Sequence, residues 1–80
     1  MDNIELIDLF TWTEEEFFKN TEGSPIRRIG YECWKRNIAI ALGNADTSVE
    51  IIQILKSELG KTSPMVREHI EWALLQHRAA

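Results

Sequence analysis

Helix start signals recur along the chain, and they constrain its fold more than any other feature. Thr13 and Glu16 have the spacing of a capping box, in which each side chain bonds the backbone amide of the other residue. Ser24-Pro25 and Ser63-Pro64 each place a capping serine before a proline suited to the first helical position. Apolar residues recur at intervals of three and four and do not alternate as in a strand. We therefore predict an all-α fold.

These signals divide the chain into a bundle of about five helices. Thr47 and Glu50 form a second capping-box pattern. Gly43-Asn44 and Gly60 supply the stops for the third and fourth helices. The predicted helices cover residues 4–10, 14–20, 25–42, 48–60 and 64–78.

The pattern Ser-Pro-x-x-Arg occurs at residues 24–28 and again at residues 63–67. The offset is close to the period of HEAT-type helical repeats. Because Ser-Pro is also a common helix opening, coincidence is the alternative. A repeat predicts stacked helix pairs, each of which buries its apolar face against a neighbour. We expect residues 1–80 to form a single small HEAT-like domain that resembles the end piece of a longer array.

Length and composition exclude several classes of protein. A chain of 80 residues is about one small domain, with little room for a deep substrate cavity. No apolar run approaches the roughly 20 residues that span a bilayer, and the first ten residues lack the pattern of a signal peptide. Cys33 is the single cysteine, which excludes an internal disulfide and any site built from several thiolates. We predict a cytoplasmic protein.

Charge is divided unevenly along the chain. The net charge of −4 argues against indiscriminate binding of nucleic acid, but residues 24–37 are basic. On a helix over residues 25–42, one face would gather the candidate RNA-binding residues Arg27, Arg28, Tyr31, Lys35 and Arg36. The alternative is a solvated amphipathic face, because four basic residues make a small patch and an acid, Glu32, lies inside it.

Three polar side chains fall on apolar helix faces. Asn37 lies near the centre of such a face, where a buried amide needs hydrogen-bond partners, so we predict a buried structural link. His69 and His77 share the apolar side of the last helix, and too few ligands lie nearby for a metal site. We predict structural roles for both histidines. The residues predicted to fill the core include Trp12, Trp34 and Trp72.

No constellation for catalysis is evident. The acidic run at residues 14–16 is explained by capping and by the helix dipole. Cys33 has no histidine near it in sequence, which favours an inert, buried thiol over a nucleophile. A glycine-rich phosphate loop, a nucleophile elbow and a metal-binding helix motif are all missing from the sequence. We predict no catalytic residue, metal or cofactor in this chain, and an independent enzyme is the least favoured interpretation.

Three stretches carry a family resemblance: SPIRRIG at residues 24–30, WKRNIAIALGN at residues 34–44, and VREH at residues 66–69 followed by Trp72-Ala73. They resemble the C-terminal region of the epoxyqueuosine reductase (QueG) family, and the resemblance covers nearly the whole chain. It implies an oxidoreductase parent that converts epoxyqueuosine to queuosine in tRNA. The family uses cobalamin and two 4Fe–4S clusters, whose cysteines belong to upstream domains and are not in this chain.

The resemblance also implies a role for the chain itself. It would be a non-catalytic, HEAT-like domain that packs on the catalytic domains of the parent and helps to seat the anticodon arm of tRNA. The sequence departs from the family pattern at Tyr31-Glu32, which brings a carboxylate into the proposed contact surface. The alternative function is a HEAT-type adaptor between proteins, with no role in binding RNA.

Overall fold

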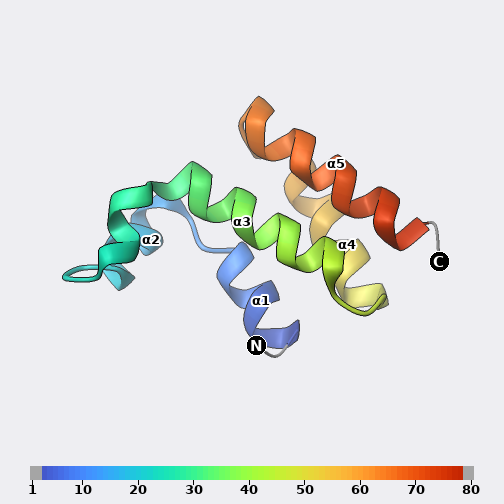
Figure 1. The fold of residues 1–80 in the computed structure, drawn as a ribbon, viewed down its shortest axis with the longest axis horizontal. Coiled ribbons are helices and arrows are strands. Elements are labelled where there is room, and N and C mark those ends of the chain that lie inside the picture. The colour runs from blue at the N-terminus through green and yellow to red at the C-terminus, as the bar shows by residue number, and fades with distance from the viewer. Residues whose placement is uncertain (1–2, 79–80) are drawn as a thin grey trace.

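The computed structural model describes residues 3–78 and is all-α, as predicted. Figure 1 shows how the elements follow one another. In order they are α1 (Asn3–Phe10), α2 (Glu14–Asn20), the 3₁₀ helix η1 (Pro25–Ile29), α3 (Tyr31–Asn44), α4 (Val49–Leu59) and α5 (Pro64–Arg78).

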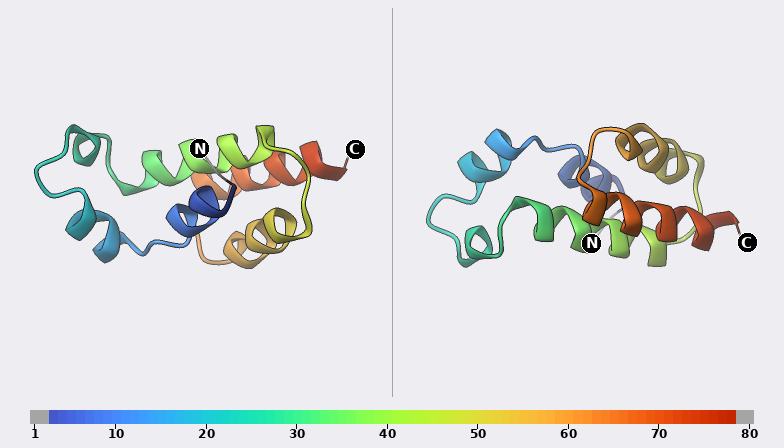
Figure 2. Two further views of the ribbon diagram at one scale, coloured as in Figure 1. Left: turned by 90° about the horizontal axis from the view of Figure 1, so that it is seen from below. Right: turned by 90° about the horizontal axis from the view of Figure 1, so that it is seen from above.

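The helices form two layers. α3 and α5 lie side by side and run in the same direction (Figure 1), and α1 and α4 lie together on one side of them (Figure 2). The molecule measures 39 × 27 × 17 Å, and a thickness of 17 Å suits two helices packed about 8 to 10 Å apart. The α2–η1 segment extends from the end of this slab where α3 begins.

One apolar core fills the space between the layers. It draws side chains from α1, α2, α3, α4 and α5, so no helix buries its apolar face alone. The buried core residues are Phe10, Phe17, Trp34, Ile38, Ala39, Leu42, Ile51, Leu55, Val66, Ile70 and Ala73. Trp34 is buried as predicted, Trp12 packs against the core, and Trp72 is 38% exposed at its edge, contrary to the prediction.

The predicted capping box of the second helix is confirmed. Glu16 N donates to Thr13 Oγ1 at 3.2 Å, and Thr13 N donates to Glu16 Oε1 at 2.9 Å. α2 then places Phe17 in the core, where its ring lies 5.0 Å from that of Trp34. Local capping therefore fixes how α2 enters the bundle.

The predicted helix over residues 25–42 is wrong at its N-terminal third. Ser24 Oγ does accept from Ile26 N at 3.3 Å, but the turn that follows Pro25 is 3₁₀ and ends at Ile29. Gly30 has a φ of +84°, a conformation that glycine adopts without steric cost, and α3 begins only after it. The break turns η1 away from the axis of α3, so the two segments do not share one helical face.

The predicted cap of the fourth helix is wrong by one residue. Ser48, not Thr47, is the N-cap, and its Oγ accepts from Ile51 N at 3.2 Å. The Thr47 hydroxyl instead lies 3.0 Å from Nδ1 of His77 on α5. Thr47 therefore contacts another helix and does not cap α4.

Ser48→Ala is expected to destabilise the chain by about 1 kcal/mol, because the amide of Ile51 loses its acceptor. Urea denaturation followed by circular dichroism would measure the loss. Glu50→Ala should cost less, since no bond joins its carboxylate to the cap. A larger loss for Glu50→Ala than for Ser48→Ala would contradict this assignment of the cap.

Candidate nucleic-acid interface

Arg27 and Arg28 are the two candidate residues that the structure leaves fully available. Both are exposed on η1, and no ion pair involves either of them among residues 3–78. The guanidinium of Arg27 lies 5.3 Å from the centre of the Phe18 ring, a cation–π contact that leaves its hydrogen-bond donors free. Together with Gly23, Ser24 and Pro25 they line a surface depression of about 390 Å³, which we name the arginine hollow.

Lys35 lies inside the molecule and not on a basic face. It is only 4% exposed, and its Nζ forms an ion pair with Glu58 Oε1 of α4 at 2.6 Å. The same ammonium lies 5.1 Å from the centre of the Phe10 ring. A lysine held in this way joins α3 to α4 and is not available to a phosphate.

Tyr31 belongs to the same buried network. Its hydroxyl donates to the carbonyl of Trp12 at 2.6 Å and accepts from Lys35 Nζ at 3.3 Å. Lys61 adds a longer, exposed contact of 3.8 Å to the second oxygen of Glu58. The network therefore ties the connection between α1 and α2 to α3 and α4, and every buried side-chain polar atom of the described residues has a partner.

Arg36 and Asn37 form a local pair on the surface of α3. Arg36 is half-buried and donates from Nε and Nη2 to Asn37 Oδ1 at 3.4 and 3.1 Å. The prediction that Asn37 is a buried link is wrong, because its side chain is exposed. That prediction rested on one continuous helix over residues 25–42. Because η1 and α3 are separate, it placed Asn37 on the wrong face.

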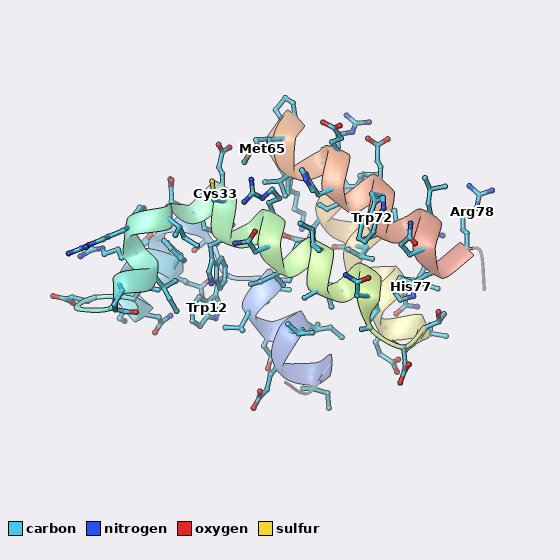
Figure 3. All side chains as sticks on the ribbon, in the orientation of Figure 1. Trp12, Cys33, Met65, Trp72, His77 and Arg78 are labelled. Atoms are coloured by element: carbon cyan, nitrogen blue, oxygen red, sulfur yellow. The ribbon has the colours of Figure 1, made fainter. Side chains whose placement is uncertain are left out.

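The two histidines have structural partners within the chain. His69 is half-buried, and its Nδ1 donates to the carbonyl of Met65 at 2.8 Å within α5. His77 is buried, and its Nε2 donates to the carbonyl of Leu42 at 2.7 Å. His77 thus links the end of α5 to the end of α3 (Figure 3).

A second depression lies beside the arginine hollow, and the sequence did not indicate it. We name it the tryptophan groove; it has a volume of about 380 Å³, and its lining includes Leu9, Trp12, Ile26, Trp34, Asn37 and Ala41. Figure 3 places Trp12 below α3, between α2 and α1. Its lining comes mainly from α1, η1 and α3, so the groove depends on how η1 is placed after the break at Gly30.

Side chains that could bind a metal ion are not gathered in the described part of the chain. Within residues 3–78 no group of three or more His, Cys, Asp and Glu side chains is placed to hold a metal ion. A 4Fe–4S cluster takes four cysteines, whereas Cys33 is the single cysteine of the sequence. No helix of the described part is long and apolar enough to cross a membrane.

Known epoxyqueuosine reductases contain a segment that is similar to this chain. The chain is 54% identical over 77 residues to an epoxyqueuosine reductase of Pseudomonas aeruginosa, and the match covers 96% of this chain. An epoxyqueuosine reductase of Shewanella oneidensis is 57% identical over 94% of the chain, and that of Escherichia coli is 56% identical over 90%. The chain is homologous to one segment of epoxyqueuosine reductase. The resemblance predicted from residues 24–44 and 66–73 is thereby confirmed.

The match is to a part of each epoxyqueuosine reductase. The chain spans only about a fifth of the length of these relatives, namely 21%, 20% and 19%. No protein-family model matches the chain, and no solved structure does.

Proposed function

We propose that this chain is the non-catalytic, C-terminal, HEAT-like domain of an epoxyqueuosine reductase. In this role it helps to seat tRNA and packs on the catalytic domains of the parent enzyme. The parent's oxidoreductase chemistry, with cobalamin and two 4Fe–4S clusters, would belong to the other four-fifths of the protein. A tRNA substrate would be met in the cytoplasm.

The observation that carries the RNA contact is the pair of exposed arginines on η1, neither of which forms an ion pair among residues 3–78. Guanidinium groups bind phosphate oxygens in a bidentate manner. They bind phosphate most strongly where no carboxylate is already paired with them. Arg27 and Arg28 satisfy both conditions, and Arg36 adds a half-buried third charge on α3. Lys35 is not part of this surface, because its ammonium group is buried in an ion pair with Glu58.

The two-layer arrangement supports the HEAT-like part of the proposal. In helical repeats, equivalent helices of successive units lie side by side and run in the same direction. α3 and α5 do so (Figure 1). The second Ser-Pro-x-x-Arg segment opens α5 itself, whereas the first opens η1, directly before α3.

Arg27→Gln combined with Arg28→Gln is expected to weaken binding of the chain to a tRNA anticodon stem-loop. Each lost phosphate contact should reduce the slope of log affinity against log salt by about 1, so the double variant should lose about 2. An NMR titration of the labelled chain at two salt concentrations would measure affinity and locate the shifted amides.

Arg67→Gln combined with Arg78→Gln serves as the matched control, because it removes the same number of charges from two exposed positions on α5. It should leave the salt slope nearly unchanged. If the control lost as much affinity as the Arg27→Gln, Arg28→Gln variant, the loss would come from net charge and not from the position of the arginines. Unchanged spectra of the wild type at low salt would contradict the RNA role.

A groove between α4 and α5 favours the second candidate, an adaptor that contacts protein. Its volume is about 660 Å³, and its mainly apolar lining includes Ile52, Leu59, Leu74 and Leu75, with Leu75 55% exposed. Exposed apolar surface of this kind marks protein contacts more often than RNA contacts. Under this alternative, added catalytic domains would shift the amides of α4 and α5, and RNA would shift none.

A further inference from the structure

The arginine hollow and the tryptophan groove lie next to each other. Ser24 lines both of them, and η1 contributes Arg27 and Arg28 to the hollow and Ile26 to the groove. A ligand that reached from one to the other would therefore meet two cationic side chains at one end and an apolar, aromatic surface at the other.

The walls of the tryptophan groove suit a flat, partly polar group. Trp12 is half-buried and stacks on Trp34, with ring centres 5.2 Å apart and planes inclined by 17°. Ile26 also lines the groove and is 49% exposed. A volume of about 380 Å³ is at the small end of the range for ligand pockets, about 300 to 1,000 Å³.

The polar groups of the groove are neutral. Asn37 Oδ1 accepts from Arg36, which leaves the two hydrogens of Nδ2 without an acceptor among the described residues. The other polar lining residues are Asn20, Thr21 and Ser24, and no carboxylate is among them. Amides and hydroxyls of this kind can bond the edge of a nucleobase, and no carboxylate in the lining would repel the phosphates beside it.

We propose that the tryptophan groove receives one unpaired nucleobase of an RNA whose adjoining phosphates lie in the arginine hollow. This inference rests on the proposed RNA contact and adds a site to it. RNA-binding proteins commonly stack single-stranded bases on aromatic side chains while arginines hold the backbone. The neighbouring arginines favour RNA over an apolar protein side chain as the occupant, because a purely apolar occupant would leave them unused.

The test compares two RNAs with the same number of phosphates, a hairpin with an unpaired loop and a blunt duplex. The wild-type chain should bind the hairpin roughly tenfold or more tightly than the duplex at equal salt, as expected for one stacked base. Ala41→Phe fills the groove from α3 and should abolish that preference. Its salt slope should remain that of the wild type, since Arg27 and Arg28 are intact.

Gln53→Phe is the control for an added aromatic ring, because Gln53 is exposed on α4 and does not line the groove. It should keep the preference for the hairpin. If circular dichroism shows that Ala41→Phe is unfolded, Ile26→Ala repeats the test at a half-exposed side chain. Ile26→Ala should reduce the preference for the hairpin several-fold.

The outcomes separate the two proposals. If the wild type prefers the hairpin and Ala41→Phe or Ile26→Ala keeps that preference, the nucleobase site is overturned while the phosphate contact stands. Equal binding of hairpin and duplex by the wild type also overturns it. If neither RNA binds at low salt, the proposed RNA role and the nucleobase site both fail.

Discussion

Glu58→Ala is expected to destabilise the chain by about 3 to 5 kcal/mol, because it leaves the Lys35 ammonium buried without a counter-ion. Lys35 is 4% exposed, and its bond to Glu58 is 2.6 Å long. The remaining polar neighbour, the Tyr31 hydroxyl at 3.3 Å, is neutral and cannot replace a carboxylate. At about 0.05 to 0.15 kcal/mol per residue, a chain of this size has a total stability of roughly 4 to 12 kcal/mol. The variant should therefore lose from about a quarter to all of that stability, a loss that urea denaturation would measure.

Two further variants identify the cause. Lys61→Ala removes the exposed partner of the same carboxylate, 3.8 Å away with 68% of its side chain exposed, and should cost no more than about 1 kcal/mol. Lys35→Met with Glu58→Leu removes both buried charges and should recover most of the stability lost in Glu58→Ala. If the double variant were as unstable as Glu58→Ala, loss of packing would explain the effect better than the unpaired charge.

Lys35 also marks the limit of what the sequence could predict. Its partner lies 23 residues away on another helix, and no spacing rule connects the two positions. The prediction that Lys35 shares a face with Arg27 depends on one continuous helix from Pro25. A single glycine with a positive φ, Gly30, breaks that helix and changes which residues share a face.

Local chemistry, in contrast, predicted part of the fold correctly, although the cap at Thr47 was wrong. The all-α class and the capping box of Thr13 and Glu16 follow from contacts within one helical turn, and all of them are confirmed. The exposed arginines were also identified as candidates, since charged side chains without a near partner stay at the surface. The tryptophan groove was missed because it requires α1, η1 and α3 to be placed in space.

Gly43 is a second residue whose role depends on a contact between helices and could not be predicted from the sequence. Gly43-Asn44 was the predicted stop after a helix ending at residue 42, but α3 continues to Asn44 and Gly43 is buried within it. The α3–α5 contact requires a residue without a side chain at this point. A Cβ atom on Gly43 would lie 2.5 Å from Trp72 Cζ3 and 3.1 Å from Ala73 Cα.

Gly43→Val is consequently expected to destabilise the chain by about 3 kcal/mol, the upper part of the range for overpacking. The Trp72 ring is partly exposed and can move away, but the backbone of Ala73 can do so only if α5 shifts away from α3. Gly43→Ala should lose less, because a better helix propensity of about 1 kcal/mol offsets part of the clash. Thermal and urea denaturation would measure both variants.

Gly60→Ala is the matched control for the loss of a glycine. Gly60 follows α4 with a φ of −86°, and a Cβ atom there would meet nothing within 4 Å. The change should be neutral or slightly stabilising, because alanine restricts the unfolded chain without straining the folded one. Trp72→Leu added to Gly43→Val should recover part of the loss, since it removes the closest contact but leaves the Ala73 backbone in place. Full recovery would locate the whole clash in the tryptophan ring, and no recovery would locate it in the α3–α5 backbone contact.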